Sequence, residues 1–375
     1  MLAQALHEHR ANFDMQDFMQ QLCFRDAGLS DNPDYTGASI SPHTYANREA
    51  DKQTAYYSIS GWMDGGGYTN GAIQRHRWLK NPENRLMLGP WDHGARANAS
   101  PWRRANEPQQ PIVGGAVIRF FDKHLKGMAT AIEDETPVHY FTMGAEVWQS
   151  TDSWPPAAEQ LSHYLEASHT LSQSAPSASA GSDTHQADFA CGTGTHSRYD
   201  RLYIENVDTY YDDWDGREDA MLSYTGAPLA EDREVTGHPW VDLHFACSEK
   251  DCTFFVYLCD ITPEGKSVYV TEGVFRALHR KPGENPPNVP TTGPAHSFKI
   301  ADAEILTPGE PAAASFELLP TSYLFRRGHH IRVSIAFSDT DHFTRIPDGR
   351  PPRVTLFRHE ARASRIVLPV VRTVS

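Results

Sequence analysis

The sequence has no long uninterrupted apolar run, although 39% of its 375 residues are hydrophobic. A membrane-spanning helix needs roughly 20 predominantly apolar residues in succession, so we expect no membrane segment and no membrane partner. Basic residues are also few, since 34 Lys and Arg stand against 48 Asp and Glu, which gives a formal net charge of −14. Phosphate backbones repel a surface of that sign, which argues against nucleic acid as a partner.

Cysteine is scarce as well, with five residues, an odd number, and no pair at C-x-x-C spacing. Such a set predicts neither a disulfide framework nor a cysteine-based metal site, and buried free thiols are the favoured interpretation. The acidic segment 208–216 lacks the ligand spacing of a calcium loop. The neighbours His329 and His330 diverge if they lie on a strand. We therefore expect no bound metal.

Two short apolar runs, 54–60 and 85–88, are each followed by a loop that carries a functional side chain. The first run leads into Gly61-Trp62-Met63-Asp64 and the second into Gly89-Pro90-Trp91-Asp92-His93, with a helix-length stretch from Tyr68 to Lys80 between them. In an open α/β sheet, functional groups lie at the carboxyl ends of the strands. A carboxylate followed by a histidine matches the last two members of an α/β-hydrolase triad, Ser…Asp…His.

This pattern predicts that His93 is the base that takes a proton from a serine and returns it to the leaving group. Asp64 is predicted to hold the imidazole in the correct tautomer. Asp92 is an alternative carboxylate, but adjacent side chains of an extended segment point to opposite faces. Trp62 and Trp91 are candidates for the wall of a substrate pocket, and core packing is the more common role of such residues.

The first member of the triad is missing from the chain. An α/β-hydrolase nucleophile occupies a strained turn flanked by glycines. Only Ser30, Ser39 and Ser267 follow a glycine by two residues, and none has a glycine two or three residues later. Only 63 residues precede Asp64, too few for the strands that come before it in such a sheet. We therefore expect the C-terminal part of a longer enzyme and no nucleophile in this chain.

The spacing of apolar residues changes near residue 136. Before this point, apolar residues recur at roughly helical spacing from Met1 to Gly28, and Ile112–Lys126 is an amphipathic helix closed by Gly127. After it, short apolar or alternating runs are separated by Pro and Gly, which predicts a β-sandwich or jelly roll. The Ser-, Ala- and Gly-rich stretch 172–194 is expected to be a loop within it.

Several segments of the chain carry motifs that are informative when taken in order: Gly61–Asp64, Arg85–His93, Phe120–Gly127, Met143–Trp148 with Trp154-Pro155, Glu234–Gly237 and Phe325–Val333. Together they resemble the CocE/NonD hydrolases, a family of cocaine-esterase-like enzymes, α-amino acid ester hydrolases and Xaa-Pro dipeptidyl-peptidases. Met63 is a departure, since the family has Tyr at this point of its Gly-Trp-Tyr-Asp segment.

The resemblance implies a fold of the α/β plus all-β class. Residues 1–50 would be the end of a helical cap, 51–135 the C-terminal part of an α/β-hydrolase domain, and 136–375 a jelly-roll β-sandwich domain. It also implies a serine hydrolase that cleaves a small ester, amide or peptide through an acyl-enzyme, without a cofactor. Its partner would be the missing N-terminal hydrolase half. Localisation and oligomeric state are left open, with the cytoplasm as the default.

A second function is consistent with the residues. Jelly-roll domains often bind sugars, so a non-catalytic carbohydrate-binding or interaction module is the alternative. The placement of Asp64 and His93 at two successive strand ends favours the hydrolase, whereas the missing nucleophile favours the module.

Overall fold

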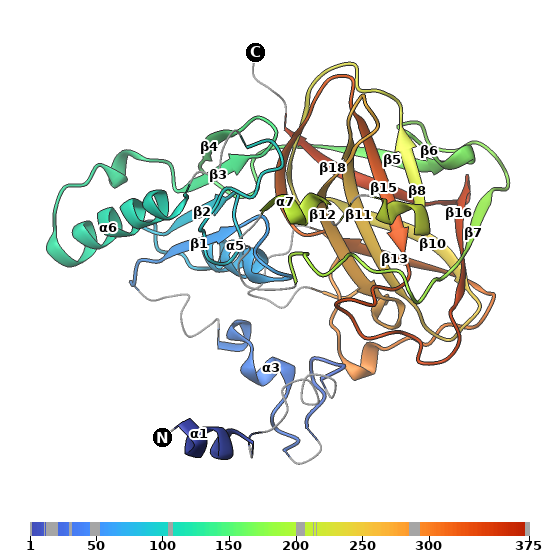
Figure 1. Ribbon diagram of the computed structural model, residues 1–375, viewed down its shortest axis with the longest axis horizontal. Helices are drawn as coiled ribbons and strands as arrows, with labels where there is room; N and C mark the ends of the chain where they lie inside the picture. The colour runs from blue at the N-terminus through green and yellow to red at the C-terminus, as the bar shows by residue number, and fades with distance from the viewer. Residues whose placement is uncertain are drawn as a thin grey trace.

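The computed structural model describes residues 2–10, 12, 22–29, 32–45, 53–103, 108–199, 207–212, 214, 216–284 and 293–371. A small α/β part and a larger β part lie side by side, and the segment with α1 and α3 lies apart from the small sheet (Figure 1). None of the helices in these ranges is long and apolar enough to cross a membrane. The α-helices are α1 Leu2–His9, α3 Gly37–Ile40, α5 Tyr68–Trp78, α6 Gln110–Lys126 and α7 Val207–Asp212. The 3-10 helices are η1 Pro42–Tyr45, η2 Ile132–Asp134, η3 Ala167–His169, η4 Arg217–Ala220, η5 Ala277–His279 and η6 Ile300–Asp302.

The α/β part contains a four-stranded sheet in the order β1-β2-β3-β4. Its strands are β1 Tyr57–Gly61, β2 Arg85–Gly89, β3 Val138–Thr142 and β4 Val147–Thr151. β1, β2 and β3 run parallel, and β4 returns antiparallel to β3. Parallel neighbours need a crossover connection, usually helical, and the chain provides α5 between β1 and β2 and α6 between β2 and β3.

The two helices cover opposite faces of this sheet. Leu86 and Leu88 of β2 share a buried cluster with Ile73 of α5, whereas Met87 belongs to a separate cluster with Ala116 of α6. Successive side chains of a strand point to opposite faces, so this alternation makes a three-layer arrangement. The carboxyl ends of β1 and β2 therefore meet at one edge of the sheet, with a helix on each side.

Helix α6 confirms the helix expected over residues 112–126, and it ends where Gly127 adopts the left-handed conformation at φ 67°. Glycine accepts this conformation without the steric cost that a Cβ would bring. One face of α6 leaves large apolar side chains in solvent: Ile118, Phe121 and Leu125 are 62%, 49% and 76% exposed. Such a stripe is typical of a helix face that packs against another layer.

The β part is a β-sandwich, as the sequence predicts. Its strands belong to one continuous 14-stranded assembly, in which β11 is paired on both sides, with β12 and β15. The strands are β5 Glu159–Glu166, β6 Thr170–Ser172, β7 Ser182–Gln186, β8 Leu222–Gly226, β9 Arg233–Gly237, β10 Trp240–Cys247, β11 Thr253–Ile261, β12 Ser267–Arg276, β13 Pro311–Glu317, β14 Thr321–Phe325, β15 His330–Ala336, β16 Arg353–His359, β17 Arg362–Ala363 and β18 Arg365–Val371. Aromatic rings such as Phe245, Phe254 and Phe316 fill the space between the layers.

Two details differ from the expectation. The run at 138–143 lies after residue 136 and is therefore among those expected in the β-sandwich, but β3 pairs with β2 instead, and β4 pairs with β3. Its short, mostly apolar run fits either sheet, and the crossover through α6 decides which one it joins. The stretch 172–194, expected to be a loop, contains β7, which pairs with β16. Polar residues occupy both faces of β7, so the apolar alternation that marks a strand is absent.

The N-terminal expectation is tested only in part. Within the helical spacing predicted from Met1 to Gly28, the structure describes α1, while residues 13–21 lie outside the described residues. The division of the chain at residues 50 and 135 stays a prediction. Residues 24–26 lie near the β-sandwich, because the Arg25 backbone N–H donates to the Phe298 carbonyl at 2.8 Å.

A buried histidine of β5 should make the stability of the protein pH-dependent. His163 is 6% exposed, and burial lowers its pKa from 6.5 to about 4, with a further contribution from the nearby Arg233 cation. The unfolded chain therefore binds more protons than the folded chain between these values, so stability decreases as the pH falls through this window. In His163→Gln, the pH slope of the unfolding free energy should decrease by up to about 1.4 kcal/mol per pH unit. Urea unfolding at a series of pH values measures this slope, and equal slopes in variant and wild type would contradict the assignment.

Candidate active site

Asp64 and His93 lie side by side, although 29 positions separate them in the chain. The imidazole Nδ1 of His93 is 2.9 Å from Oδ1 of Asp64. The contact forms because β1 and β2 are parallel neighbours with Gly61 opposite Gly89, so the loops that follow them leave the same sheet edge. The distance lies in the range of a charge-assisted hydrogen bond.

The Asp64 carboxylate is held on its other side as well. Ser60 Oγ donates to Oδ2 of Asp64 at 2.6 Å and lies 3.4 Å from Thr69 Oγ1. The Thr69 hydroxyl donates to the Gly61 carbonyl at 2.6 Å. The Asp64 side chain is 6% exposed, and a buried carboxylate is stable only when its oxygens are hydrogen-bonded. These contacts fix the direction in which Oδ1 faces His93.

The His93 ring combines a fixed edge with an accessible one. Its side chain is 45% exposed, and the ring of Tyr68 lies against it at a centroid distance of 4.8 Å. Because Nδ1 faces Asp64, Nε2 lies on the opposite edge of the ring. In a Ser-His-Asp triad, Nδ1 contacts the carboxylate and Nε2 takes the proton of the nucleophile. The ring is therefore oriented as a triad base requires.

Two glycines allow the two loops to approach each other. A Cβ on Gly61 would lie 2.0 Å from the Trp91 carbonyl oxygen, and a Cβ on Gly89 would lie 2.2 Å from the Trp91 indole. The Trp62 backbone N–H donates to the Gly89 carbonyl at 2.9 Å, and the Met63 N–H donates to the Trp91 carbonyl at 3.1 Å. Any larger residue at either glycine would push the Asp64 and His93 loops apart.

The other residues proposed from the sequence, Asp92, Trp62 and Trp91, contact neighbouring protein groups. Asp92 accepts a hydrogen bond from the Gly94 backbone N–H at 3.1 Å, while His93 contacts Asp64. Trp62 is 1% exposed and donates from Nε1 to the Phe141 carbonyl at 2.7 Å. Trp91 is also 1% exposed, and its ring lies near that of Trp148. Both indoles thus lie in the core, where they offer a substrate no surface.

The serines that follow a glycine by two residues have no nucleophile geometry where they are described. Ser39 caps the short helix α3 together with Thr36. Ser267 begins β12 and is 8% exposed. Ser30 lies outside the described residues. Ser60 is near the pair, but it contacts Asp64 rather than the accessible edge of His93.

The structure also brings a residue of the β-sandwich into contact with the Asp64 loop, and no pattern in the sequence predicts this contact. The guanidinium of Arg198 donates from Nη2 to the Trp62 carbonyl and from Nε to the Gly65 carbonyl, both at 2.7 Å. More than 130 positions separate these partners in the chain. No local spacing could have shown the contact.

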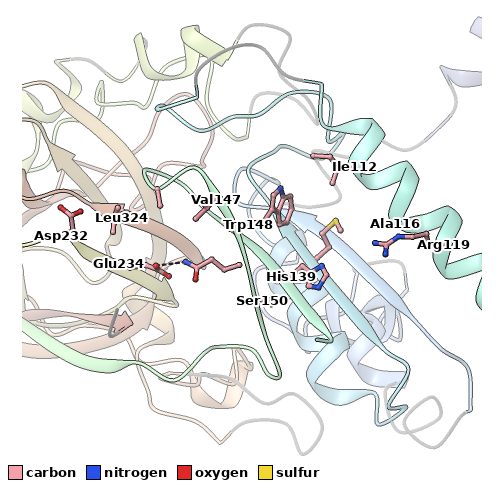
Figure 2. Close-up of a pocket in the computed structure, with 13 residues that line it drawn as sticks. Ile112, Ala116, Arg119, His139, Val147, Trp148, Ser150, Asp232, Glu234 and Leu324 are labelled. Carbon is pink, nitrogen blue, oxygen red and sulfur yellow. Dashed lines mark hydrogen bonds between the residues drawn. The ribbon is translucent and has the colours of Figure 1, made fainter. Parts of the chain in front are cut away.

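Two other parts of the described structure are candidates for a site. Within the described ranges, no cluster of three or more His, Cys, Asp or Glu could hold a metal ion, and His329 contacts the buried Asp260 carboxylate at 2.9 Å instead. A groove of about 800 Å³ lies between α6, β4 and the sandwich (Figure 2). Its lining includes Arg119, Trp148 and Glu234 but neither Asp64 nor His93. The groove is therefore separate from the Asp64–His93 pair.

Comparison with known proteins agrees with this architecture. The family described as the X-Pro dipeptidyl-peptidase C-terminal non-catalytic domain matches residues 130–367. A Mycobacterium bovis protein named as a serine esterase is 40% identical over 98% of this chain, and cocaine esterase of a Rhodococcus species is 27% identical over 76% of it. The chain spans 61% and 49% of the lengths of these two relatives.

A solved structure shares the fold. The CocE/NonD family hydrolase of Staphylococcus aureus superposes with a TM-score of 0.63 at 17% identity, over 85% of this chain and 54% of that one. The chain belongs to the family that carries the X-Pro dipeptidyl-peptidase C-terminal non-catalytic domain. Its named relatives include a serine esterase and a cocaine esterase, and a CocE/NonD family hydrolase shares its fold.

Proposed function

We propose that this chain supplies the base and the orienting carboxylate of a serine hydrolase that cleaves esters or amides through an acyl-enzyme. The observation that carries the proposal is the 2.9 Å contact between Asp64 Oδ1 and His93 Nδ1 at the ends of adjacent parallel strands. The accessible edge of His93 supports it, because Nε2 must reach a serine hydroxyl. The substrate class is a small ester, amide or peptide.

The nucleophile, in this proposal, belongs to an N-terminal hydrolase half that precedes the chain. The chain spans only 61% of its Mycobacterium bovis relative. Among the described residues, β1 pairs with β2 alone, so its other edge can accept a further strand. The exposed apolar face of α6, with Ile118, Phe121 and Leu125, is suited to pack against a neighbouring layer. Both features fit a sheet that continues beyond β1.

Catalysis would then proceed in two balanced steps. The serine oxygen attacks the substrate carbonyl while Nε2 of His93 takes the serine proton, and the protonated ring returns that proton to the departing alcohol or amine. In the second step, water attacks the acyl-serine and gives its proton to His93. The ring then returns that proton to the serine oxygen as the bond to the acyl group breaks and the acid is released. Asp64 stays ionised and stabilises the imidazolium. The donors that stabilise the oxyanion would come from the nucleophile half, as in other α/β-hydrolases.

Ester turnover by two lengths of the protein tests this proposal. One is the chain of residues 1–375, and the other, called the extended form, adds the hydrolase half that we propose is encoded upstream of Met1. Residues 1–375 alone should not exceed the buffer rate with a small activated ester, because the nucleophile and the oxyanion donors are both absent. The extended form should turn the ester over with saturation kinetics. An extended form that folds and shows no turnover would contradict the proposal.

The alternative is a non-catalytic module that binds carbohydrate or another protein. The groove of Figure 2 favours it, since the 36%-exposed indole of Trp148 lies near the hydrogen-bonded pair Gln149 and Glu234. Calorimetric titration of residues 1–375 with simple sugars separates the two functions. Saturable binding that is lost in Trp148→Ala would favour the module.

A further inference from the structure

We infer that Arg198, a residue of the β-sandwich, is a positioning residue for the Asp64–His93 pair. The inference rests on the proposed function, because it assigns to Arg198 the task of holding the loop that carries Asp64. The matched C-terminal domain includes Arg198 and is described as non-catalytic. The contacts of Arg198 connect this domain to the geometry of the candidate catalytic pair.

Arg198 holds both ends of the Asp64 turn. Its two nitrogens Nη2 and Nε donate to the carbonyls of Trp62 and Gly65, which lie before and after Asp64. The Asp64 backbone N–H donates to the Gly61 carbonyl at 3.1 Å, and Gly65 has a φ of 57°. Hydrogen bonds from a charged donor are stronger than those between neutral groups. Two of them, from one rigid planar group, fix the distance between the two carbonyls.

The guanidinium is itself fixed by a buried network in the β-sandwich. Its Nη1 donates to the Tyr269 hydroxyl at 3.2 Å, and that hydroxyl donates to Oε2 of Glu272 at 2.8 Å. The Tyr199 hydroxyl donates to the other carboxylate oxygen of Glu272. Arg198 and Glu272 are each 3% exposed. The positive charge of Arg198 is thus balanced by the Glu272 carboxylate, and the Tyr269 hydroxyl connects the two groups. Tyr269 and Glu272 both lie on β12.

The electrostatics of this network favour a charged arginine. Burial by itself lowers the pKa of Arg198, but Tyr269, Tyr210, Tyr199 and Glu272 around it raise the pKa above its ordinary value. Burial raises the pKa of the Glu272 carboxyl, and the Arg198 cation opposes that change. A guanidinium that stays protonated throughout the working pH range keeps all its donors.

Aromatic rings packed around the Asp64 turn also restrict its movement. The Tyr199 ring lies against Gly66, where an added Cβ would be 3.0 Å from the ring. The Tyr68 ring lies near Gly65 and near the imidazole of His93. The turn is therefore enclosed between the β-sandwich and the helix that follows it. If Arg198 is lost, the turn can relax and Asp64 can rotate away from Nδ1.

The tautomer of His93 reports this geometry without any need for a nucleophile. In residues 1–375 labelled with [15N]histidine, long-range nitrogen–proton spectra at about pH 8, where an ordinary imidazole is neutral, distinguish the Nδ1–H from the Nε2–H form. The His93 signals are assigned by their loss in His93→Gln. Wild type should show the Nδ1–H tautomer, because Asp64 accepts that proton. Arg198→Met should shift His93 toward the Nε2–H form.

Arg85 provides the matched control. It is also a buried arginine, 8% exposed, and it donates to the carbonyls of Pro82, Asn84 and Ile132 at the opposite end of β2. Arg85→Met should reduce thermal stability without changing the His93 tautomer. An equal tautomer shift in both variants would overturn the inference, since it would show a general effect of lost stability.

Two further variants complete the test. If Arg198→Met does not fold, Arg198→Lys decides, because an ammonium is a point charge on a flexible chain and lacks the planar fork that fixes two acceptors. An unchanged His93 tautomer in the folded lysine variant would overturn the inference. Asp64→Ala separates this inference from the proposed function. If Asp64→Ala shifts the tautomer and the folded Arg198 variants do not, only the role of Arg198 fails. If Asp64→Ala leaves the tautomer unchanged, the Asp64–His93 assignment itself fails.

Discussion

In the extended form, His93→Ala should lower kcat by about 10⁴- to 10⁶-fold with an activated ester, the loss seen when a triad member is removed. The reason is that His93 supplies the imidazole next to Asp64 Oδ1, and no other described side chain could replace it there. Without the imidazole, no group can take the serine proton. The fold should survive, because the His93 side chain is 45% exposed and its loss leaves no large cavity. Steady-state kinetics with a matched thermal unfolding curve measure both effects.

His124→Ala is the control for this variant. His124 lies on α6 and packs against the ring of Phe120, within the same α/β part but in contact with neither Asp64 nor its loop. The kcat of the His124→Ala variant should stay near that of wild type. A loss in His124→Ala as large as that in His93→Ala would show that the rate depends on the integrity of the α/β part rather than on a base at His93.

Asp64→Asn should reduce kcat by about 10⁴-fold, because it imposes the wrong tautomer on the base. Ser60 donates to the second carboxylate oxygen of Asp64, and the Thr69 hydroxyl is already committed to the Gly61 carbonyl. The amide oxygen of the variant is therefore expected to face Ser60 and its NH2 group to face His93. That NH2 donates to Nδ1 and places the ring proton on Nε2, which then cannot accept the serine proton.

The contact between Ser60 and Asp64 predicts a partial rescue. Removing the Ser60 hydroxyl allows the amide to turn its oxygen toward Nδ1, so Ser60→Ala combined with Asp64→Asn should be more active than Asp64→Asn alone. Steady-state kinetics of both variants and of Ser60→Ala supply the comparison. Asp92→Asn tests the rival carboxylate, and a greater loss there than in Asp64→Asn would transfer the orienting role to Asp92.

The sequence allowed the prediction of those features that depend on local patterns. The residues of α6 repeat at helical spacing and end at Gly127, and the helix begins within two residues of its predicted start at Ile112. The contact between Asp64 and His93 was also predictable, because a strand-helix-strand unit brings the ends of two parallel strands together. In both cases a periodicity and its boundaries are visible within a short window of the chain.

Features that depend on distant parts of the chain could not be read in this way. β3 is a short, mostly apolar run that would suit a sandwich strand, and only its pairing with β2 shows that it belongs to the smaller sheet. β7 has polar residues on both faces, so its own sequence does not mark it as a strand. It is a strand because its backbone pairs with β16. Arg198 reaches the Asp64 loop across more than 130 positions. Such contacts are set by packing in three dimensions.

Labelling by a fluorophosphonate, which reacts only with an activated serine, tests the central claim most directly. Residues 1–375 and the extended form are treated in parallel, each as wild type and as His93→Ala, and the bound probe is measured by intact mass. The account predicts one bound probe per chain in the extended wild type and none in its His93→Ala variant or in either form of residues 1–375. Stoichiometric labelling of residues 1–375 would contradict the account, because it would reveal a nucleophile within this chain.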